Sequence, residues 1–243
     1  MRAIILAGGT GTRMRPYTTV LPKPLMPIGD VPIADIVVNQ LKYHGITNIT
    51  MAVGYLAELL MAYFGDGSKY GISICYSKEN SPLGTAGPLA LIPNLDSTFL
   101  LMNGDVLTTL NYADLVAYHR NSGAVATIAM HPRRVKIDLG VIQTNGSNEL
   151  VDYIEKPTHE YVVSMGVYVF EPTVLRYIRP GEPLDFPDLI RTLLRHGERV
   201  IGYPFDGYWQ DIGRPDDYER AVEEFECRKR ELLPYAAADG VLG

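Results

Sequence analysis

Apolar runs of strand length and amphipathic segments of helix length alternate along the first half of the chain. Residues 2–7 and 48–54 are apolar runs that end at glycines, as buried strands commonly do. Between them, residues 32–44 carry apolar side chains at helical spacing, and Gly45 follows as a helix-ending residue. The pattern also predicts strands at 72–77, 98–103 and 124–130, and helices at 56–64, 84–92 and 111–120. This alternation favours an α/β fold with a doubly wound, mainly parallel, Rossmann-like sheet.

Beyond residue 130 the predicted strands follow one another without intervening helices. Strands are expected at 139–143, 150–155 and 161–170, with the hairpin residues Asn145-Gly146 between the first two. An antiparallel portion therefore joins the parallel sheet. A helix at 185–196, strands at 199–204 and 208–212, and a charged helix at 217–232 complete the pattern. We expect one domain over residues 1–233, made of parts at about 1–130, 131–215 and 216–233, and a frayed tail at 234–243.

Composition excludes several classes of protein. The 243 residues are 47% hydrophobic and 21% charged, which supports a packed core. No apolar run is long enough to span a membrane, and the apolar N-terminal stretch is too short for a signal peptide, so we expect a cytoplasmic protein. Cys75 and Cys227 are too far apart for a zinc or disulfide pattern. The net charge of −6 argues against nucleic acid as a partner.

A glycine-rich loop follows the first predicted strand. Glycines here let backbone N–H groups approach and bind anionic oxygens. The loop is not a P-loop, because no lysine follows at the required spacing. It is not a dinucleotide fingerprint either, because Met14 stands where the third glycine belongs and the second strand ends without an acidic residue. Ten residues after Arg13, Lys23 lies between two prolines that restrict the backbone, which makes it a suitable fixed charge for a phosphate.

Residues 8–16 (GGTGTRMRP) and 22–27 (PKPLMP) together resemble the signature of the sugar-nucleotide pyrophosphorylases. Residues 82–87 (PLGTAG) and 209–213 (WQDIG) are nearest to the mannose-1-phosphate guanylyltransferase branch of this family. The resemblance covers residues 1 to about 218. It implies transfer of a nucleotidyl group from a nucleoside triphosphate to a sugar 1-phosphate, with Arg13 and Lys23 as catalytic cations. The antiparallel portion would then bind the sugar phosphate.

Two carboxylates are candidate metal ligands. Asp105 follows a central strand at the crevice where ligands of parallel sheets bind, and Asp211 is a charge within an apolar strand, which favours a metal or cationic partner. Taken alone, Asp105 is equally compatible with a turn-capping role. The resemblance makes both of them ligands of Mg²⁺, an ion that needs few protein ligands because phosphates and water complete its shell.

The resemblance also implies two sets of binding residues. For the nucleotide, the residues are Leu6, Ala7, Gly8, Gly9, Thr10, Gly11, Thr12, Arg13, Glu79, Pro82, Gly84, Thr85 and Gly104. For the sugar phosphate, the residues are Gly140, Glu155, Lys156, Ser164 and Gly166.

Base and sugar stay open at this point. Branch similarity favours GTP with mannose 1-phosphate or heptose 1-phosphate, and thymidylyl, uridylyl or cytidylyl transfer to another sugar 1-phosphate is the alternative. A non-catalytic regulatory protein that binds a sugar nucleotide, and a nicotinamide-dependent oxidoreductase, are the competing classes. Many relatives assemble, so a homo-oligomer is also open.

Overall fold

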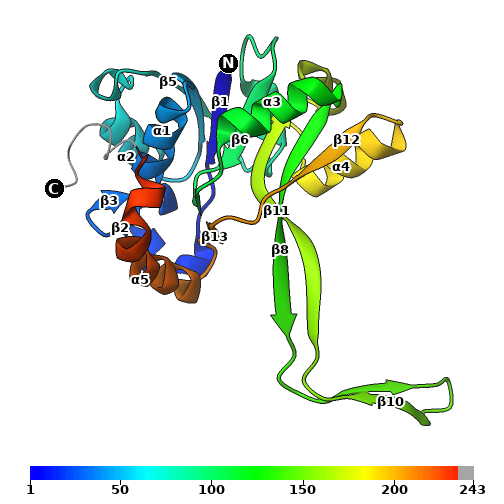
Figure 1. Ribbon diagram of the computed structural model, residues 1–243. Coiled ribbons are helices and arrows are strands. Elements are labelled where there is room, and N and C mark those ends of the chain that lie inside the picture. Colours follow the sequence, from blue (N-terminus) through cyan, green and yellow to red (C-terminus); the bar gives the residue numbers. More distant parts are fainter. Residues whose placement is uncertain (235–243) are drawn as a thin grey trace.

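The computed structural model describes residues 1–234, which form a twisted mixed sheet with helices on both faces (Figure 1). The sheet has seven strands in the order β12-β8-β11-β6-β1-β4-β5. β6, β1, β4 and β5 are parallel, whereas β11 runs antiparallel between β6 and β8. The predicted fold class is therefore confirmed. The strands are β1 (Arg2–Ala7), β4 (Asn48–Val53), β5 (Ser73–Lys78), β6 (Phe99–Asn103), β8 (Ala126–Lys136), β11 (Thr158–Phe170) and β12 (Val200–Pro204).

Within residues 1–234, five α-helices surround the sheet. They are α1 (Ile33–Tyr43), α2 (Ala57–Phe64), α3 (Tyr112–Ser122), α4 (Phe186–Arg195) and α5 (Pro215–Leu232). The helix predicted at 84–92 is instead a short 3-10 turn, η5 (Gly87–Leu91). Further 3-10 turns are η1 (Thr12–Met14), η2 (Tyr17–Thr19), η3 (Lys23–Leu25), η4 (Ser68–Tyr70) and η6 (Pro172–Tyr177). No helix within residues 1–234 has the length and apolar character needed to cross a bilayer. The tail predicted at 234–243 lies outside the described residues, except for Pro234.

Three short two-stranded pairs lie outside the main sheet. They are β2 (Pro27–Ile28) with β3 (Val31–Pro32), β7 (Val106–Thr108) with β13 (Trp209–Asp211), and β9 (Val141–Thr144) with β10 (Leu150–Ile154). The turn between β9 and β10 contains the predicted residues Asn145-Gly146, and Asn145 N donates to Glu149 O at 3.0 Å. The hairpin predicted there is confirmed.

The core has one cluster on each face of the sheet and a third beneath the glycine loop. Successive β1 side chains point to opposite faces, so Ile5 packs with α1 and α2 while Ile4 packs with η5 and α4. In the third cluster, Phe225 of α5 packs with Met14 and Ile212. The C-terminal helix therefore supports the two segments that carry the candidate cations and carboxylates.

β8 and β11 continue beyond the body of the molecule as a two-stranded ribbon, and β9 and β10 lie at its far end (Figure 1). We call residues 132–162 the arm. Its strand residues are exposed on both sides, in contrast to the buried second half of β11 from Met165 onward. The arm is thus an extension of the central sheet that no other element of the described chain covers.

Gly166 lies in β11 where the strand enters the body, and its backbone is left-handed with φ of +73°. A Cβ atom there would lie 2.5 Å from Asn103 Nδ2. Gly166→Ala should therefore lower the free energy of unfolding by about 2–3 kcal/mol, because backbone strain and a steric clash add. Gly197 has the same φ of +73° and open space around it. Gly197→Ala, the matched control, should cost only about 1 kcal/mol in urea unfolding. Equal costs would contradict the clash.

Candidate active site

The glycine loop forms one wall of a cavity of about 550 Å³ at the carboxyl ends of β1, β4 and β6. Gly11 has φ of +60°, and its carbonyl accepts a hydrogen bond from Thr18 Oγ1 at 2.7 Å, which fixes the loop before η1. Gly8 leaves no room for a side chain, since a Cβ atom would lie 2.8 Å from Glu79 Oε1. The loop is thus held in one conformation with its backbone facing the cavity.

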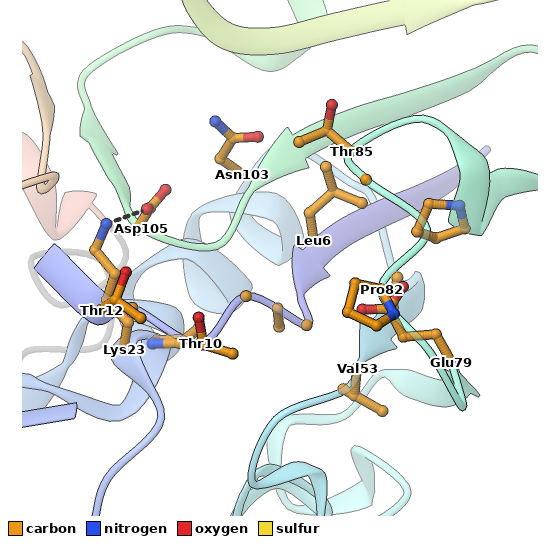
Figure 2. A pocket seen from close by; sticks show the side chains of 18 of the residues that line it. Leu6, Thr10, Thr12, Lys23, Val53, Glu79, Pro82, Thr85, Asn103 and Asp105 are labelled. Carbon is orange, nitrogen blue, oxygen red and sulfur yellow. Dashed lines mark hydrogen bonds and ion pairs between the residues drawn. The ribbon is translucent and has the colours of Figure 1, made fainter. Parts of the chain in front are cut away.

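Nearly all of the residues predicted to bind the nucleotide line this cavity, and Figure 2 shows how they are divided. Lys23, Asp105 and Thr12 lie at one end, while Glu79 and Pro82 lie at the other, across Leu6. Gly104 is the exception, because it is buried beneath the loop and its N–H donates to Leu6 O at 2.9 Å. The cavity is lined by Leu6, Ala7, Gly8, Gly9, Thr10, Gly11, Thr12, Arg13, Lys23, Pro24, Ala52, Val53, Ser77, Glu79, Pro82, Gly84, Thr85, Pro88, Asn103, Asp105 and Asp211.

The loop at 82–85 is attached to the start of α4 by Asp185, a residue that sequence reasoning missed. The N–H and the hydroxyl of Thr85 both donate to Asp185 Oδ1, at 3.0 and 3.2 Å. The Thr85 hydroxyl in turn accepts a hydrogen bond from Phe186 N at 2.8 Å. Phe186 is the first residue of α4, and the N–H groups at the start of a helix have no partner within the helix. Glu79 Oε2 holds the other side of the loop by accepting from Leu83 N at 3.1 Å. No local pattern signals a contact between residues 100 positions apart.

Thr85→Val removes this cap while keeping the shape of the side chain. We expect the loss of about 1 kcal/mol of stability, since the Phe186 N–H and the Asp185 carboxylate each lose a partner. Because the loop would be less well ordered, the KM for the substrate that binds in this cavity should rise about fivefold with little change in kcat. Thr192→Val, which also removes a hydroxyl hydrogen bond in α4 but lines neither cavity, is the matched control. A selective fall in kcat would instead place Thr85 among the reacting groups.

Lys23 forms an ion pair with Asp105 at the mouth of β6 (Figure 2). The Pro22-Lys23-Pro24 segment folds as the 3-10 turn η3, and only 9% of Lys23 is exposed. Arg13 lies at the same end of the cavity, on the loop after β1. A Cβ atom on Gly213 would be 3.7 Å from Arg13 Nη1 and 3.3 Å from Asp211 Oδ2. The two predicted cations and the two predicted carboxylates are therefore brought together.

Asp105 and Asp211 are held on neighbouring backbone segments. Asp211 pairs with Val106 across β13 and β7, and Ile212 N donates to Asp105 O at 3.1 Å. Burial raises the pKa of Asp211, and the negative charge of Asp105 raises that pKa further. Asp105 Oδ1 is buried without a hydrogen-bond partner within the described residues. A buried, unpartnered carboxylate oxygen beside a second carboxylate fits a cation.

The donor set matches the requirements of Mg²⁺. The part of the chain that the structure describes contains no cluster of three or more histidine, cysteine, aspartate or glutamate side chains suited to a metal. Mg²⁺ commonly takes one or two carboxylates and completes its octahedron with phosphate oxygens and water. Asp105 and Asp211 meet this minimum number of protein ligands.

A second cavity, of about 280 Å³, adjoins the first and shares Asn103 and Asp211 with it. Two of the predicted sugar-phosphate residues, Ser164 and Gly166, line this cavity. Its other lining residues are Arg133, Val163, Met165, Tyr168 and Trp209. Trp209 stands in the WQDIG segment, so the motif contained a signal for it, whereas Arg133 had none.

Polar contacts fix the wall of the second cavity. Trp209 Nε1 donates to Met165 O at 2.9 Å, and Ser164 Oγ donates to the Tyr168 hydroxyl at 3.0 Å. Burial raises the pKa of Tyr168, so its hydroxyl stays neutral. This wall offers hydroxyl groups and the Trp209 side chain, which suit a sugar ring.

Gly140, Glu155 and Lys156 line neither cavity, because they lie in the arm, at the joint between the β8–β11 ribbon and the β9–β10 hairpin. Thr158 is six residues from Ser164 on one extended strand, which corresponds to roughly 20 Å at the usual rise. The space above Gly140 is filled by the Tyr153 side chain, whose hydroxyl would lie 2.1 Å from a Cβ atom there. Within one chain, the predicted sugar-phosphate residues are therefore divided between two places.

Comparisons with known proteins agree with the fold. A family model described as nucleotidyl transferase matches residues 2–227. A UTP–glucose-1-phosphate uridylyltransferase of Synechocystis is 36% identical over 91% of this chain and 62% of its own length. A mannose-1-phosphate guanyltransferase of Schizosaccharomyces pombe is 36% identical over 90% of this chain, which again spans only 62% of that relative.

A crystal structure from Bacillus anthracis, assigned as a glucose-1-phosphate thymidylyltransferase, has a TM-score of 0.75 and 25% identity to this chain. The match covers 92% of this chain and 94% of that one. The resemblance inferred from the glycine loop and the Pro-Lys-Pro segment is confirmed: the chain belongs to the nucleotidyl transferase family, among the sugar-nucleotide pyrophosphorylases.

Proposed function

We propose that this chain joins a nucleoside triphosphate to a sugar 1-phosphate and releases pyrophosphate. The observation that carries the proposal is the junction of the two cavities at Asn103 and Asp211. One cavity offers a glycine loop and cations to a triphosphate, and the other offers hydroxyl groups and an indole to a sugar. Two substrates bound there would meet next to Lys23, Arg13 and the paired carboxylates.

The reaction requires charge neutralisation more than proton transfer. An oxygen of the sugar phosphate attacks the α-phosphorus, a new P–O bond forms, and the bond to the β-phosphate breaks as pyrophosphate leaves. The nucleophile is already anionic at pH 7, so no general base is needed. Lys23, Arg13 and the N–H groups of the glycine loop offset repulsion between two anions and hold them in line. A magnesium ion on Asp105 and Asp211 would supply Lewis-acid charge at the α-phosphate.

The choice of substrate is proposed from the branch that the sequence resembles, which favours GTP with mannose 1-phosphate or heptose 1-phosphate. The matched relatives carry names with uridylyl, guanyl and thymidylyl groups, so the family alone is compatible with several bases. Backbone groups around Pro82, Gly84 and Thr85 line the end of the cavity opposite Lys23, where the base would lie. These residues are candidates for base selection.

A matrix of triphosphates against sugar 1-phosphates tests the proposal. ATP, GTP, UTP, CTP and dTTP are each combined with phosphates of mannose, a heptose, glucose and an amino sugar, and pyrophosphate is measured. We expect one pair to exceed the others in kcat/KM by at least about tenfold, and we expect GTP to be its triphosphate. Binding of a sugar nucleotide without pyrophosphate release from any pair would indicate a regulatory protein instead.

A further inference from the structure

The arm carries a concentration of exposed apolar side chains that the rest of the described chain lacks. Of the nineteen large hydrophobic residues exposed within residues 1–234, nine lie in the arm, which is 31 residues long. Folded monomers rarely leave a contiguous apolar patch of more than roughly 300–600 Å² open to water unless it binds something. The nine are Val135, Leu139, Ile142, Leu150, Val151, Tyr153, Ile154, Tyr161 and Val162.

Two strands alone do not make a stable sheet. An isolated hairpin is at best marginally stable in water, because neither face is covered. All five residues of β10 are exposed, as are all the arm residues of β11, from Thr158 to Val162. The arm therefore needs a surface to pack on, and the described chain does not supply one.

The direction of the arm is set by the central sheet. β8 and β11 are continuous strands, paired from Ala126 with Phe170 in the body to Lys136 with Thr158 in the arm. The pairing has one irregularity, between Ser164 and Tyr168, at the second cavity. For the arm to fold back over its own cavities, this ladder would have to break. The arm instead points away from the body (Figure 1).

The joint between the β8–β11 ribbon and the β9–β10 hairpin carries a cation, Lys156, that the described chain does not pair closely with a carboxylate. Lys156 has φ of +45°, a left-handed conformation that costs a non-glycine residue about 1 kcal/mol or more. Its ammonium lies 3.8 Å from Glu155 Oε1, and the side chain is 55% exposed. The second cavity, by contrast, has only Arg133 as a cation among its described lining residues. A doubly charged sugar phosphate there lacks a second positive partner.

We propose that the arm packs on a second copy of this chain and delivers Lys156 and Glu155 to the second cavity of that copy. The exchange is reciprocal in a two-fold symmetric dimer, so both arms are covered and both sites are completed at once. The role of Lys156 toward a sugar phosphate rests on the proposed function, whereas the covering of the apolar arm does not. Each active site is then built from two chains.

Complementation between two inactive chains tests the exchange. One chain carries Lys156→Ala in the arm and the other carries Asp105→Asn in the body, with different affinity tags so that mixed dimers can be purified. If the arm acts on the partner, one of the two sites in a mixed dimer is intact, and about half of the wild-type kcat returns. If each arm serves its own chain, both sites are defective and pyrophosphate release stays at the level of the parent variants.

A mirrored mixture gives the opposite expectation. Wild-type chains are paired with chains carrying both Lys156→Ala and Asp105→Asn. An arm exchanged between chains leaves both sites of this mixed dimer defective, whereas an arm acting within its own chain leaves one site intact. Half activity in the mirrored mixture, with none in the first, would overturn the proposal.

The oligomeric state gives a readout that does not depend on activity. We expect sedimentation to show a dimer at micromolar concentration. Replacing three exposed arm valines (Val135→Thr, Val151→Thr and Val162→Thr) should raise the dimer dissociation constant at least about tenfold, because each change removes buried apolar surface. The matched control changes two exposed valines of the body, Val20→Thr and Val222→Thr, and should leave the dissociation constant unchanged.

These measurements distinguish a failure of the proposed function from a failure of the arm exchange. A wild-type protein that dimerises through its arm but releases no pyrophosphate would refute the proposed function and leave the arm exchange standing. An active wild-type protein that sediments as a monomer, or whose dimer is insensitive to the three arm changes, would refute the arm exchange alone.

Discussion

Lys23→Ala is expected to lower kcat by about two to three orders of magnitude. Lys23 is buried at the cationic end of the cavity and holds its ammonium against Asp105. A charge fixed in this way neutralises the phosphate during attack without the cost of reorganising solvent. Because the charge acts on the transition state, the loss should be seen in kcat and kcat/KM together, with the KM changed little. Initial rates of pyrophosphate release at saturating substrates measure the effect.

Loss of the ion pair also affects stability, and the controls must separate the two effects. Removing Lys23 leaves a partly buried carboxylate without its cation, so a lower melting temperature is expected. Rates are therefore measured well below the melting transition, beside Lys78→Ala. Lys78 also pairs with a carboxylate, Glu58, but its side chain is half exposed and lines neither cavity. A folded Lys23→Ala protein with near-normal turnover would remove Lys23 from the mechanism.

The strands and helices that touch the core were largely predictable from the sequence. β1 and β4 are apolar runs, and α1 has an apolar stripe, so periodicity alone located each within about two residues. The predicted helix at 84–92 failed because Pro88 and Pro93 bracket a short segment. A proline disfavours the helical conformation of the residue before it, so Ile92 is extended and only the 3-10 turn η5 forms.

The arm was the larger gap in the prediction of the fold. β8 was expected to end near residue 130 and β11 to begin at 161, but their pairing continues from Pro132 with Val162 to Lys136 with Thr158. A strand with no buried face has no reason to alternate between polar and apolar residues, so periodicity gives no signal there. Cross-strand hydrogen bonds hold these segments extended. Such hydrogen bonds depend on the partner strand rather than on the local sequence.

The site residues were predictable where they stand close together in one sequence motif. They were not predictable where the fold brings together segments that are distant in the sequence. The glycine loop and Lys23 are close in sequence, so their resemblance to a family located them together. Asp185 supports Thr85 from 100 residues away, and Arg133 reaches the second cavity from the base of the arm. Lys156 shows a further limit of prediction from a motif. The motif indicates the chemistry of the residue, but it does not say whether the residue acts in the cavity of its own chain or in that of a second copy.

Replacing either candidate metal ligand is expected to be as damaging as replacing both. Asp105→Asn and Asp211→Asn should each lower kcat by about 10²–10³ and raise the magnesium concentration needed for half-maximal rate at least tenfold. Both carboxylates lie at one end of one cavity, and the charge of Asp105 raises the pKa of Asp211. If they hold a single ion, the first change already removes most of its contribution. The double variant should then be no more than about tenfold slower than the slower single variant.

This non-additivity separates one shared ion from two independent electrostatic effects. If the carboxylates acted independently, the losses would multiply to about 10⁴–10⁶. Asp216→Asn is the matched control, because Asp216 lies close in sequence to Asp211, in the first turn of α5, but is exposed and lines neither cavity. Its rate and magnesium dependence should equal those of the wild type. Titration of the variants with Mn²⁺ in the presence of a non-hydrolysable triphosphate, followed by electron paramagnetic resonance, measures ion binding without turnover. Undiminished Mn²⁺ binding by both single variants would show that the ion is held elsewhere and that the carboxylates serve Lys23 and Arg13 instead.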